Sequence, residues 1–350
     1  MSATKTVLYL VHKLHKRNIA QIINAKKRKK AMEQSGVKVY ALALERQRFI
    51  QNCIHLIPTL SKFDFLCIRI DGTGMLDAYT LLKLFRWNMR VIWEIHGFPE
   101  EKLYFHNTTG TKLRVFLQNI LRKQLSVLVY KDLFVSHAIK EFAGGRIIKK
   151  KYHVIPNFVD INTLRDKKSK RILLHKHIHN SEQFKVVWVG NPALQWHALD
   201  LIEEVAKHIY SRDKSVQFIL IGSNPWHVIH WKKNITLVPS LPEQRLRQVI
   251  FFADVGLALY HVSRHFPLYF SPMKILDYMA AQKPTIATDG AGIREMIVDD
   301  YNGFLTNNAI EDISHRILYF RRNAHKVKAF GATAYASVLQ RFSIHSAIRT

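Results

Sequence analysis

The sequence predicts an α/β protein built from two doubly wound, parallel-sheet domains of the Rossmann-like kind. Its 350 residues are enough for two domains. Short runs of β-branched and other apolar residues alternate with longer helical patterns from one end of the chain to the other. These runs are apolar throughout, which is typical of parallel strands buried on both faces. Ligands of such sheets bind beyond the carboxyl ends of the strands, so two facing domains are expected to enclose a cleft.

The strands follow one another in a regular order along the chain. In the first half they are TVLYLV from Thr6, KVYALAL from Lys38, FDFLCIRI from Phe63, RVIWEIHG from Arg90, DLFVS from Asp132 and YHVIPN from Tyr152. A helical pattern from Leu76, LDAYTLLKLFRW, is typical of the segments between them. In the second half the strands are FKVVWVG from Phe184, VQFILIG from Val216, ITLVPS from Ile235, DVGLALY from Asp254 and PTIAT from Pro284. Because the alternation occurs twice, two sheets are expected.

A polar, basic stretch separates the two halves. It includes RDKKSKR and HKHIHN and has no periodicity. We therefore expect a first domain over residues 1–160, a basic linker over 161–183, a second domain over 184–335 and a terminal helix over 336–350 that packs back across the cleft. The linker histidines lack a carboxylate or cysteine to complete a ligand set, so no metal site is predicted there.

Charge is distributed unevenly between the halves. Lys and Arg number 53 against 26 Asp and Glu, a net charge of +27. Residues 1–180 hold 34 Lys or Arg and 12 Asp or Glu, a net charge of +22, and the remaining residues hold 19 and 14, a net charge of +5. Such a basic half is typical of a protein that meets a polyanion: nucleic acid, anionic lipid or a phosphorylated acceptor.

Two function classes are excluded by what the sequence lacks. Cys53 and Cys67 are too few for a disulfide framework and have no metal-site spacing. No apolar run approaches the roughly 18 residues of a membrane span, and the short run from Val7 to Val11 does not resemble a signal peptide. We expect a cytoplasmic protein without disulfides.

The segment FSPMKILDYMAAQKPTIATDGAGIREMI from Phe270 carries the clearest chemical pattern. Ser271 is an N-cap candidate with Pro272 at the first helical position. A helix N-terminus suits a diphosphate, and Lys274 in the first turn adds a positive charge. Asp277, one turn further, is placed to accept hydrogen bonds from a ribose diol. An ordinary surface helix with an exposed Lys–Asp pair fits the same residues.

The order of motifs resembles the family 4 glycosyltransferases of the GT-B fold. The segment from Ser271 resembles their S-P-x-K-x-x-E/D-Y-M-A-x-x-K-P motif. WEIHGFPEE, LFVSHAIKEF and VIPNFVD resemble stretches of the family's amino domain, and VVWVG, FILIGS, LPEQRLRQVIFFADVGLAL and DDYNGFL resemble stretches of its carboxyl domain. The similarity extends over most of the chain.

The resemblance implies a retaining, metal-independent transferase without a cofactor, whose carboxyl domain holds a nucleotide-sugar donor. The residues that match the donor site are Gly190, Ser271, Lys274, Asp277, Gly292 and Glu295. His96 matches the histidine that faces the donor sugar from the amino domain, so His96 and Lys274 are the expected catalytic residues. Glu94 lies on the same strand face as His96 and is either its partner or a packed acid.

Three family features are missing from this sequence. Tyr269 stands where an acidic residue usually holds donor-sugar hydroxyls, eight positions before Asp277. The family usually has an Arg and a Lys that neutralise the leaving diphosphate, and here Asn191 and the Trp196 region occupy those positions. We expect Lys274 or Arg264 to neutralise the diphosphate instead. VHKLHKRN replaces the glycine-rich loop after the first strand.

We therefore expect transfer of a sugar to a lipid-linked or anionic glycan acceptor in surface polysaccharide synthesis, at the inner face of the cytoplasmic membrane. The basic run from Lys26 to Lys30 is expected to contact anionic lipid. Two alternatives remain open: another enzyme of the same fold, an epimerase or phosphorylase, and a basic nucleic-acid-binding protein. The basic run lies within a helical pattern and no nucleic-acid-binding module accompanies it, so no specific nucleic acid is expected.

Overall fold

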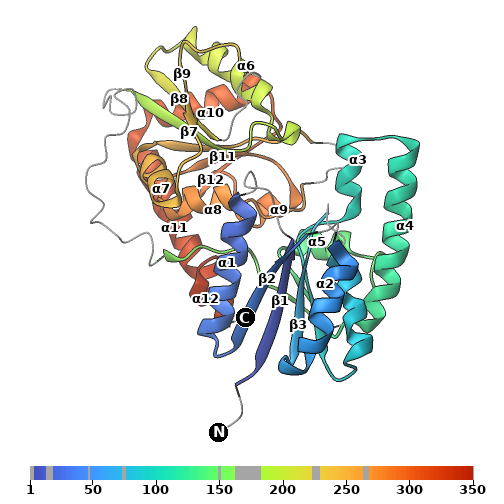
Figure 1. The fold of residues 1–350 in the computed structure, drawn as a ribbon. Coiled ribbons are helices and arrows are strands. Elements are labelled where there is room, and N and C mark those ends of the chain that lie inside the picture. The colour runs from blue at the N-terminus through green and yellow to red at the C-terminus, as the bar shows by residue number, and fades with distance from the viewer. Residues whose placement is uncertain are drawn as a thin grey trace. The chain divides into compact units, whose positions relative to one another are not determined.

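Two six-stranded parallel sheets form the framework of the protein (Figure 1). The structure is a computed structural model that describes residues 4–12, 19–45, 48–72, 76–148, 151–161, 183–222, 229–262 and 268–349. The chain divides into two units. The first comprises Met1–Asn157, Ser263–Ser271 and Ala347–Thr350, and the second comprises Phe158–Val262 and Pro272–Ser346.

The sheet of the first unit has the order β2-β1-β3-β4-β5-β6. Its strands are β1 (Thr6–His12), β2 (Lys38–Leu44), β3 (Phe65–Ile70), β4 (Arg90–Ile95), β5 (Lys131–Phe134) and β6 (Tyr152–Val154). The direction of strand addition reverses between β1 and β3, which pair in parallel from Val7 and Phe65. In sheets of this kind, ligands bind at the carboxyl ends of the strands beside such a reversal.

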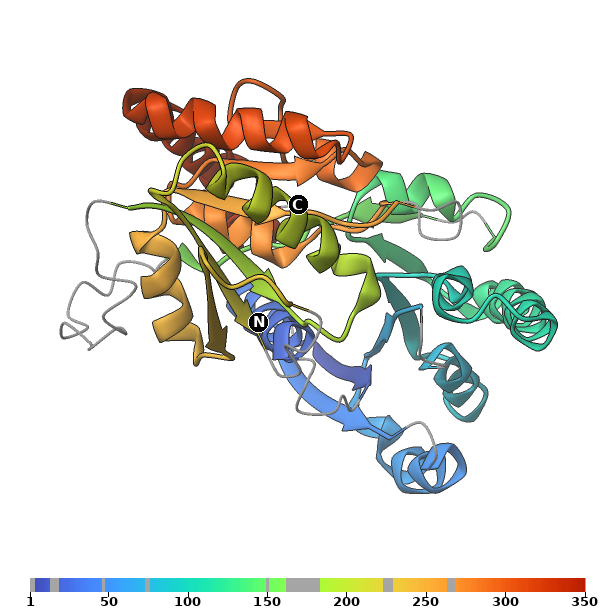
Figure 2. The same ribbon diagram turned by 90° about the horizontal axis from the view of Figure 1, so that it is seen from above.

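Helices cover both faces of the first sheet (Figures 1 and 2). They are α1 (Ile19–Gln34), α2 (Phe49–Leu56), η2 (Ile57–Lys62), η3 (Leu76–Phe85), η4 (Pro99–Glu101), α3 (Lys102–Phe105), α4 (Thr109–Leu125), η5 (Ser126–Leu128) and α5 (His137–Phe142). α1 packs on the face that carries Tyr9 and Val39. α2, η3, α4 and α5 cover the opposite face, whose core includes Leu10, Ile68 and Trp93.

The sheet of the second unit has the order β12-β11-β10-β7-β8-β9, with a reversal between β7 and β10. Its strands are β7 (Phe184–Gly190), β8 (Val216–Gly222), β9 (Ile235–Pro239), β10 (Val255–Ala258), β11 (Thr285–Thr288) and β12 (Gly303–Thr306). This is the strand order of dinucleotide-binding α/β domains, in which the ligand lies at the reversal.

Seven further helical elements and one short 3-10 turn are described in the second half of the chain. They are η7 (Gln195–His197), α6 (Leu199–Tyr210), α7 (Glu243–Phe252), α8 (Met273–Ala280), α9 (Ala291–Arg294), α10 (Ile310–Arg322), α11 (Ala324–Arg341) and α12 (Ile344–Arg349). α6 and α10 pack on one face of the sheet, and α7 and α8 pack on the other. α11 packs against α8.

A short segment before α8 belongs to the first unit, although the sequence predicted one continuous second domain. Ser136 Oγ donates to the carbonyl of Tyr269 at 2.7 Å, and Asn157 Nδ2 donates to the carbonyl of Ser271 at 2.7 Å. The side chain of Tyr269 packs in the first core. These contacts are long-range in sequence, so local patterns gave no sign of them. The expected linker lies almost entirely outside the described residues.

The eleven strands expected from the sequence are confirmed, with ends shifted by a few residues at most. β12 was not predicted, because GFLT is short and directly follows a turn. The helical pattern from Leu76 is confirmed as helical, but η3 is a 3-10 helix.

Candidate functional site

Helix α8 is held at the strand reversal of the second unit by Tyr278. The phenol of Tyr278 accepts a hydrogen bond from the amide of Val189 in β7 at 2.9 Å and donates to the carbonyl of Leu257 in β10 at 3.2 Å. Its ring occupies the space where a side chain at Gly256 would lie. Because α8 follows β10 and returns antiparallel to it, the helix N-terminus lies at the carboxyl edge of the sheet.

Lys274 lies in the first turn of α8 and its ammonium is enclosed by aromatic rings. Nζ lies 4.6 Å from the ring centroid of Trp188 and 5.2 Å from that of Tyr260. It is buried and has no hydrogen-bond acceptor among the described residues. Burial lowers the pKa of Lys274 to about 7. Ring faces stabilise a cation only in part, so this ammonium retains three unused donors for an anionic ligand.

His197 lies beside this lysine, at the end of η7 and just before α6. Its Nδ1 donates to the carbonyl of Asn191 at 2.9 Å, and its ring contacts both Trp188 and Tyr260. Burial, and then the charge of Lys274, hold the pKa of His197 well below its usual range. The imidazole is therefore neutral near pH 7 and leaves Lys274 as the cation of this cluster.

Gly190, at the end of β7, leaves no room for a side chain. A Cβ at this position would lie 2.5 Å from the Trp188 ring and 3.0 Å from His197 Nδ1. The space beside the backbone is therefore filled by the rings of Trp188 and His197, and contact between Gly190 and a nucleotide stays a prediction.

The other predicted donor residues lie at neighbouring strand ends. Asp277 is half-buried on α8, one turn after Lys274. Gly292 is buried in α9, which follows β11. Glu295 caps the end of α9, and its carbonyl accepts a hydrogen bond from Arg341 at 2.8 Å. Since β10 and β11 are adjacent, both helices begin at the same edge of the sheet.

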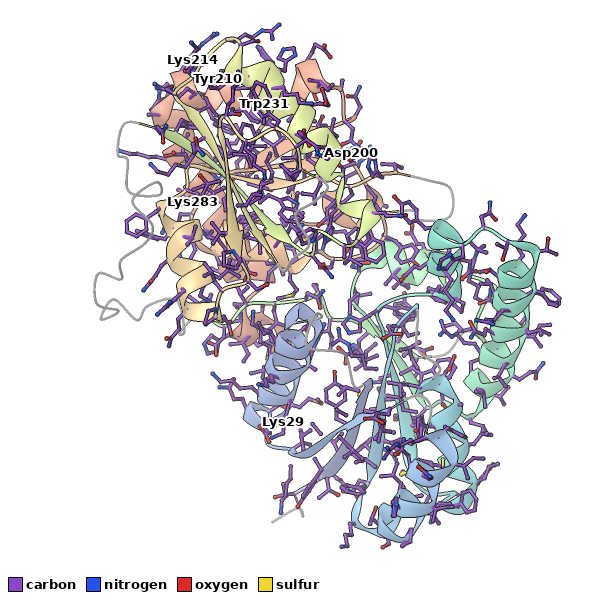
Figure 3. The ribbon with its side chains drawn as sticks, turned by 45° about the horizontal axis from the view of Figure 1, so that its top comes forward. Lys29, Asp200, Tyr210, Lys214, Trp231 and Lys283 are labelled. Carbon is purple, nitrogen blue, oxygen red and sulfur yellow. The ribbon has the colours of Figure 1, made fainter. Side chains whose placement is uncertain are left out.

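An acidic pocket of about 540 Å³ lies beside α6 in the same unit. Asp200, in the first turn of α6 (Figure 3), contacts His261 Nε2 at 2.8 Å. The lining of the pocket also includes Glu203 and Glu204. Lys207 also lines the pocket and pairs with Glu203 and Glu204, so the Asp, Glu and Lys side chains of the lining carry a net charge of −2, which opposes a diphosphate. Within the described residues, no group of three or more potential metal ligands occurs.

The first unit contains a buried ionic cluster around Glu94 of β4. Glu94 accepts hydrogen bonds from Tyr9 OH at 2.5 Å and His96 Nε2 at 2.8 Å, and pairs with Arg28 Nε at 2.9 Å. Burial opposes ionisation, but His96, Arg28 and Arg69 together hold the pKa of Glu94 below its usual range. Glu94 is thus a charged partner of His96, one of the two roles expected from the sequence.

Both ring nitrogens of His96 have partners within the first unit. Nε2 donates to Glu94, and Nδ1 lies 3.3 Å from Arg69 NH2 as its acceptor. Burial, and then the charge of Arg69, lower the pKa of His96 to about 4, so the ring is neutral near pH 7. Contact between His96 and a donor sugar stays a prediction, and it requires one of these two hydrogen bonds to be exchanged.

A second carboxylate, Glu101, lies close to the strand end that carries His96. Its Oε1 accepts a hydrogen bond from Tyr269 OH at 2.7 Å and from the amide of Phe98 at 3.3 Å. Its carboxyl group lies against the backbone of Gly72 and Gly97, where no side chain would fit. Burial raises the pKa of Glu101 to about 7, against the effect of the Tyr269 hydroxyl.

Comparison with known proteins identifies the second unit. Residues 183–323 match the family described as glycosyl transferases group 1. The second unit is a group 1 glycosyltransferase domain. This match confirms the enzyme class that the motif from Ser271 predicted. No curated protein sequence matches the chain significantly.

Solved structures with a similar fold include several that act on sugars. A glycosyltransferase from Rickettsia africae has a TM-score of 0.71 at 15% identity, covering 99% of this chain and 96% of that one. Anabaena HepE in complex with UDP and glucose has a TM-score of 0.74 at 14% identity, covering 99% and 97%. Sucrose-phosphate synthase from Thermosynechococcus elongatus has a TM-score of 0.71 at 10% identity, covering 99% and 96%. At these identities the likeness shows the fold alone, and it confirms the two-domain α/β architecture expected of this glycosyltransferase.

Two expectations about the α8 motif need correction or cannot be assessed. Helix α8 begins at Met273 with Pro272 at the N-cap position, and no side chain caps it. Ser271 therefore precedes the cap by one residue and lies in the first unit. Arg264, an expected substitute for the missing cations, lies outside the described residues.

The basic run of α1, expected to contact anionic lipid, is only partly exposed: Lys26 and Lys30 are exposed and Lys29 is half-buried. Lys27 and Arg28 are buried, and Arg28 NH2 donates to the carbonyls of Ile155 and Pro156 in addition to its pairing with Glu94. Lys29, labelled in Figure 3, pairs with Glu33 on the same helix at 2.9 Å. A run of five cations hides the periodicity that would have distinguished the buried arginine from its neighbours.

Four residues that the sequence did not indicate lie beside predicted site residues of the glycosyltransferase. They are Trp188, His197 and Tyr260 around Lys274, and Glu101 beneath Tyr269. Glu101 belongs to the WEIHGFPEE stretch that the sequence singles out. Its hydrogen bond with Tyr269 could not be predicted, because the two residues are 168 positions apart.

Proposed function

We propose that this enzyme transfers a hexose from a uridine diphosphate sugar, with retention of configuration, to a lipid-linked or anionic glycan acceptor. The observation that carries the donor assignment is the buried ammonium of Lys274, without a hydrogen-bond acceptor, at the strand reversal of a group 1 glycosyltransferase domain. Structures of similar fold were solved with UDP-glucose and with UDP and glucose, which supports the choice of donor.

The reaction needs little from the protein beyond position and charge. The acceptor hydroxyl attacks the anomeric carbon while the bond from that carbon to the phosphate oxygen breaks. The acceptor proton passes to the departing diphosphate, so no separate base is required. Negative charge grows on the diphosphate, and Lys274 is the cation that would stabilise it. Asp277 would accept hydrogen bonds from the ribose hydroxyls.

Calorimetric titration with UDP tests the donor site. Lys274→Met and Asp277→Asn should each weaken binding by about 1.5–3 kcal/mol, since each removes a charge-assisted contact. Lys283→Met is the matched control, because Lys283 is also a partly buried lysine whose pKa burial lowers, yet it follows the far end of α8. Wild-type affinity in both site variants would refute the assignment.

Glu101 is the proposed carboxylate for sugar hydroxyls. Tyr269 replaces the acidic residue that the resembling family carries, and Glu101 accepts the hydrogen bond of that tyrosine. A carboxylate is thus supplied near position 269 by a different segment of the chain. Glu101→Ala should lower the transfer rate while UDP affinity remains, because UDP belongs to the other unit.

Action at the cytoplasmic face of a membrane, in surface polysaccharide synthesis and without a metal ion, is part of the same proposal. It is supported by the net charge of +22 over residues 1–180, since anionic lipids attract a basic domain. Within the described residues, no helix combines the length and apolar character needed to cross a bilayer. Transfer that EDTA abolishes would contradict metal independence.

An epimerase is the second candidate. One structure of similar fold is a putative UDP-N-acetylglucosamine 2-epimerase from Listeria monocytogenes, with a TM-score of 0.62 at 11% identity. Incubation with the nucleotide sugar alone separates the two functions: an epimerised product without acceptor would establish the second candidate.

A further inference from the structure

The outward face of α4 has no role in the chemistry described above. This helix begins after Thr108, whose hydroxyl accepts a hydrogen bond from the Thr111 amide at 3.2 Å. Five of its exposed residues are apolar and follow one another at helical spacings of three and four. We call them the apolar stripe: Leu113, Phe116, Leu117, Ile120 and Leu121, which are between 39% and 60% exposed.

The inward face of α4 is more polar than the outward face. It consists of Val115, Gln118, Arg122 and Leu125. Gln118 accepts a hydrogen bond from Lys102 Nζ at 2.6 Å. Arg122 Nε donates to Asp77 at 2.9 Å, and NH1 donates to the carbonyl of Gly97 at 3.2 Å. Rotation of the helix would leave this buried charge pair broken, so the orientation of the apolar stripe is fixed by defined contacts.

This arrangement inverts the usual one for a surface helix. Helices of globular proteins bury their apolar side, and a contiguous exposed apolar surface marks an interaction site. The neighbouring η3, against which α4 packs, and the residues just after it add further exposed apolar side chains. Leu84 is 58% exposed, and Phe85 and Trp87 are each 65% exposed.

Charge indicates which partner covers the apolar stripe. Lys112 and Lys123 lie along one side of it and Arg114 along the other, all exposed, and α4 contains no Asp or Glu. An anionic bilayer accepts apolar side chains below its headgroups and cations beside its phosphates. A symmetric contact between two copies would instead bring the same cations together, which like-charge repulsion opposes.

We propose that α4 is a membrane-binding helix that lies in the plane of an anionic bilayer, with the apolar stripe inserted and Lys112, Arg114 and Lys123 at the level of the lipid phosphates. The inference rests on the proposed function, since a lipid-linked acceptor brings the enzyme to a membrane. It assigns the membrane contact to α4 in place of the basic run of α1.

Sedimentation with vesicles of phosphatidylcholine and phosphatidylglycerol tests the assignment. The triple variant Phe116→Gln, Leu117→Gln, Ile120→Gln should partition to these vesicles about tenfold or more weakly than the wild type, because three inserted apolar side chains are lost. Lys112→Gln with Lys123→Gln should also weaken binding and reduce its salt dependence. Glutamine is a good helix former, so α4 is retained.

The matched control makes the same kind of change elsewhere. Phe251→Gln, Val262→Gln and Val298→Gln replace three apolar residues of the second unit that are 65%, 60% and 51% exposed. This control should bind vesicles within twofold of the wild type. Equal loss in both triple variants, or none in the α4 variant, would overturn the proposal.

Two further readouts separate this inference from the proposed function. UDP affinity should be the same in the wild type and the α4 variant, because UDP belongs to the other unit, and an unchanged far-UV circular dichroism spectrum should show that the variant keeps its helices. Vesicle binding without any UDP binding would defeat the proposed function and leave the membrane assignment intact. Sedimentation equilibrium without lipid tests the other occupant: a wild-type dimer that the α4 variant converts to a monomer would assign the apolar stripe to a second copy.

Discussion

At the scale of single residues, Lys274 shows how an environment prepares a side chain for an anion. Its ammonium is enclosed by two aromatic rings and a neutral histidine, and burial lowers its pKa to about 7. A bound diphosphate would raise that pKa, so binding must take up a proton whenever the free lysine is neutral.

UDP affinity should therefore fall with rising pH. Below about pH 7 Lys274 is already charged, whereas above it the affinity should decline by up to about tenfold per pH unit as a proton must be added. Calorimetry between pH 7 and 9, in buffers of different ionisation heat, measures both the decline and the proton uptake. Lys274→Met should abolish the dependence and Lys283→Met should retain it; a flat wild-type profile would contradict the role.

Glu101 should make the stability of the protein depend on pH, because the folded state favours its protonated, neutral form. Its pKa is about 7 in the folded protein against an ordinary 4.5, so the fold favours its neutral form. That contribution to stability is complete below about pH 4.5 and is lost as the pH rises through 7.

Glu101→Gln keeps an acceptor for Tyr269 and Phe98 but cannot ionise. It should thus stabilise the protein at pH 8, relative to pH 5, by about 1–3 kcal/mol compared with the wild type. Urea unfolding at the two pH values measures the difference. An equal effect of the substitution at both pH values would show that Glu101 does not titrate in this range.

The sequence could predict residues that belong to a local pattern, such as Lys274 and Asp277 on one helix. It could not predict partners that folding brings from afar. Trp188 and Lys274 lie on separate elements, and the pairing of Glu101 with Tyr269 depends on a chain segment that leaves the second unit for the first.

At the scale of elements, strands were easier to predict than the surfaces of helices. Continuous apolar runs such as VVWVG specify buried parallel strands from composition alone. The burial of a helix face depends on the residues that it packs against. Arg28 and Arg122 face inward because they form buried ion pairs with Glu94 and Asp77. Apolar residues of α4 face outward for the same reason, so an amphipathic pattern predicts the helix but not its orientation.

Two helical glycines provide a matched test of packing between elements. A Cβ at Gly331 of α11 would overlap the carbonyl of Gln282 after α8, whereas a Cβ at Gly110 of α4 meets nothing within 4 Å. Gly331→Ala should therefore destabilise the protein by about 1–3 kcal/mol, because the two helices must separate. Gly110→Ala should instead stabilise it by up to about 1 kcal/mol, because alanine favours the helix. Chemical denaturation measures both, and a stabilising Gly331→Ala would contradict the packing of α11 on α8.

At the scale of the whole molecule, each unit has its own hydrophobic cores on the faces of its sheet, and the two halves of the chain differ in net charge. The core around Leu10 and Trp93 and the core around Trp188 and Phe218 share no residue. The cations are concentrated in the half that carries α4, while the donor motif lies in the half with a net charge of +5. Length and alternation predicted the two sheets; the passage of residues 268–271 into the first core could not be predicted, because no local feature of those residues requires it.

Separate cores imply that a ligand of one unit stabilises that unit selectively. UDP at 100 times its Kd should add about 2.7 kcal/mol to the stability of the unit that binds it, which corresponds to roughly hundredfold slower hydrogen exchange through unfolding. We expect this protection in peptides from β7 to β12 and in α8, and not in β1 to β6. Peptides that contain residues 268–271 should behave as part of the first unit, since Ser136 and Asn157 hold their backbone. Lys274→Met at the same UDP concentration supplies the control without protection. Equal slowing in both sheets would mean that the two units unfold together. Slowing confined to β1–β6 would place the nucleotide in the first unit and contradict the proposed donor site.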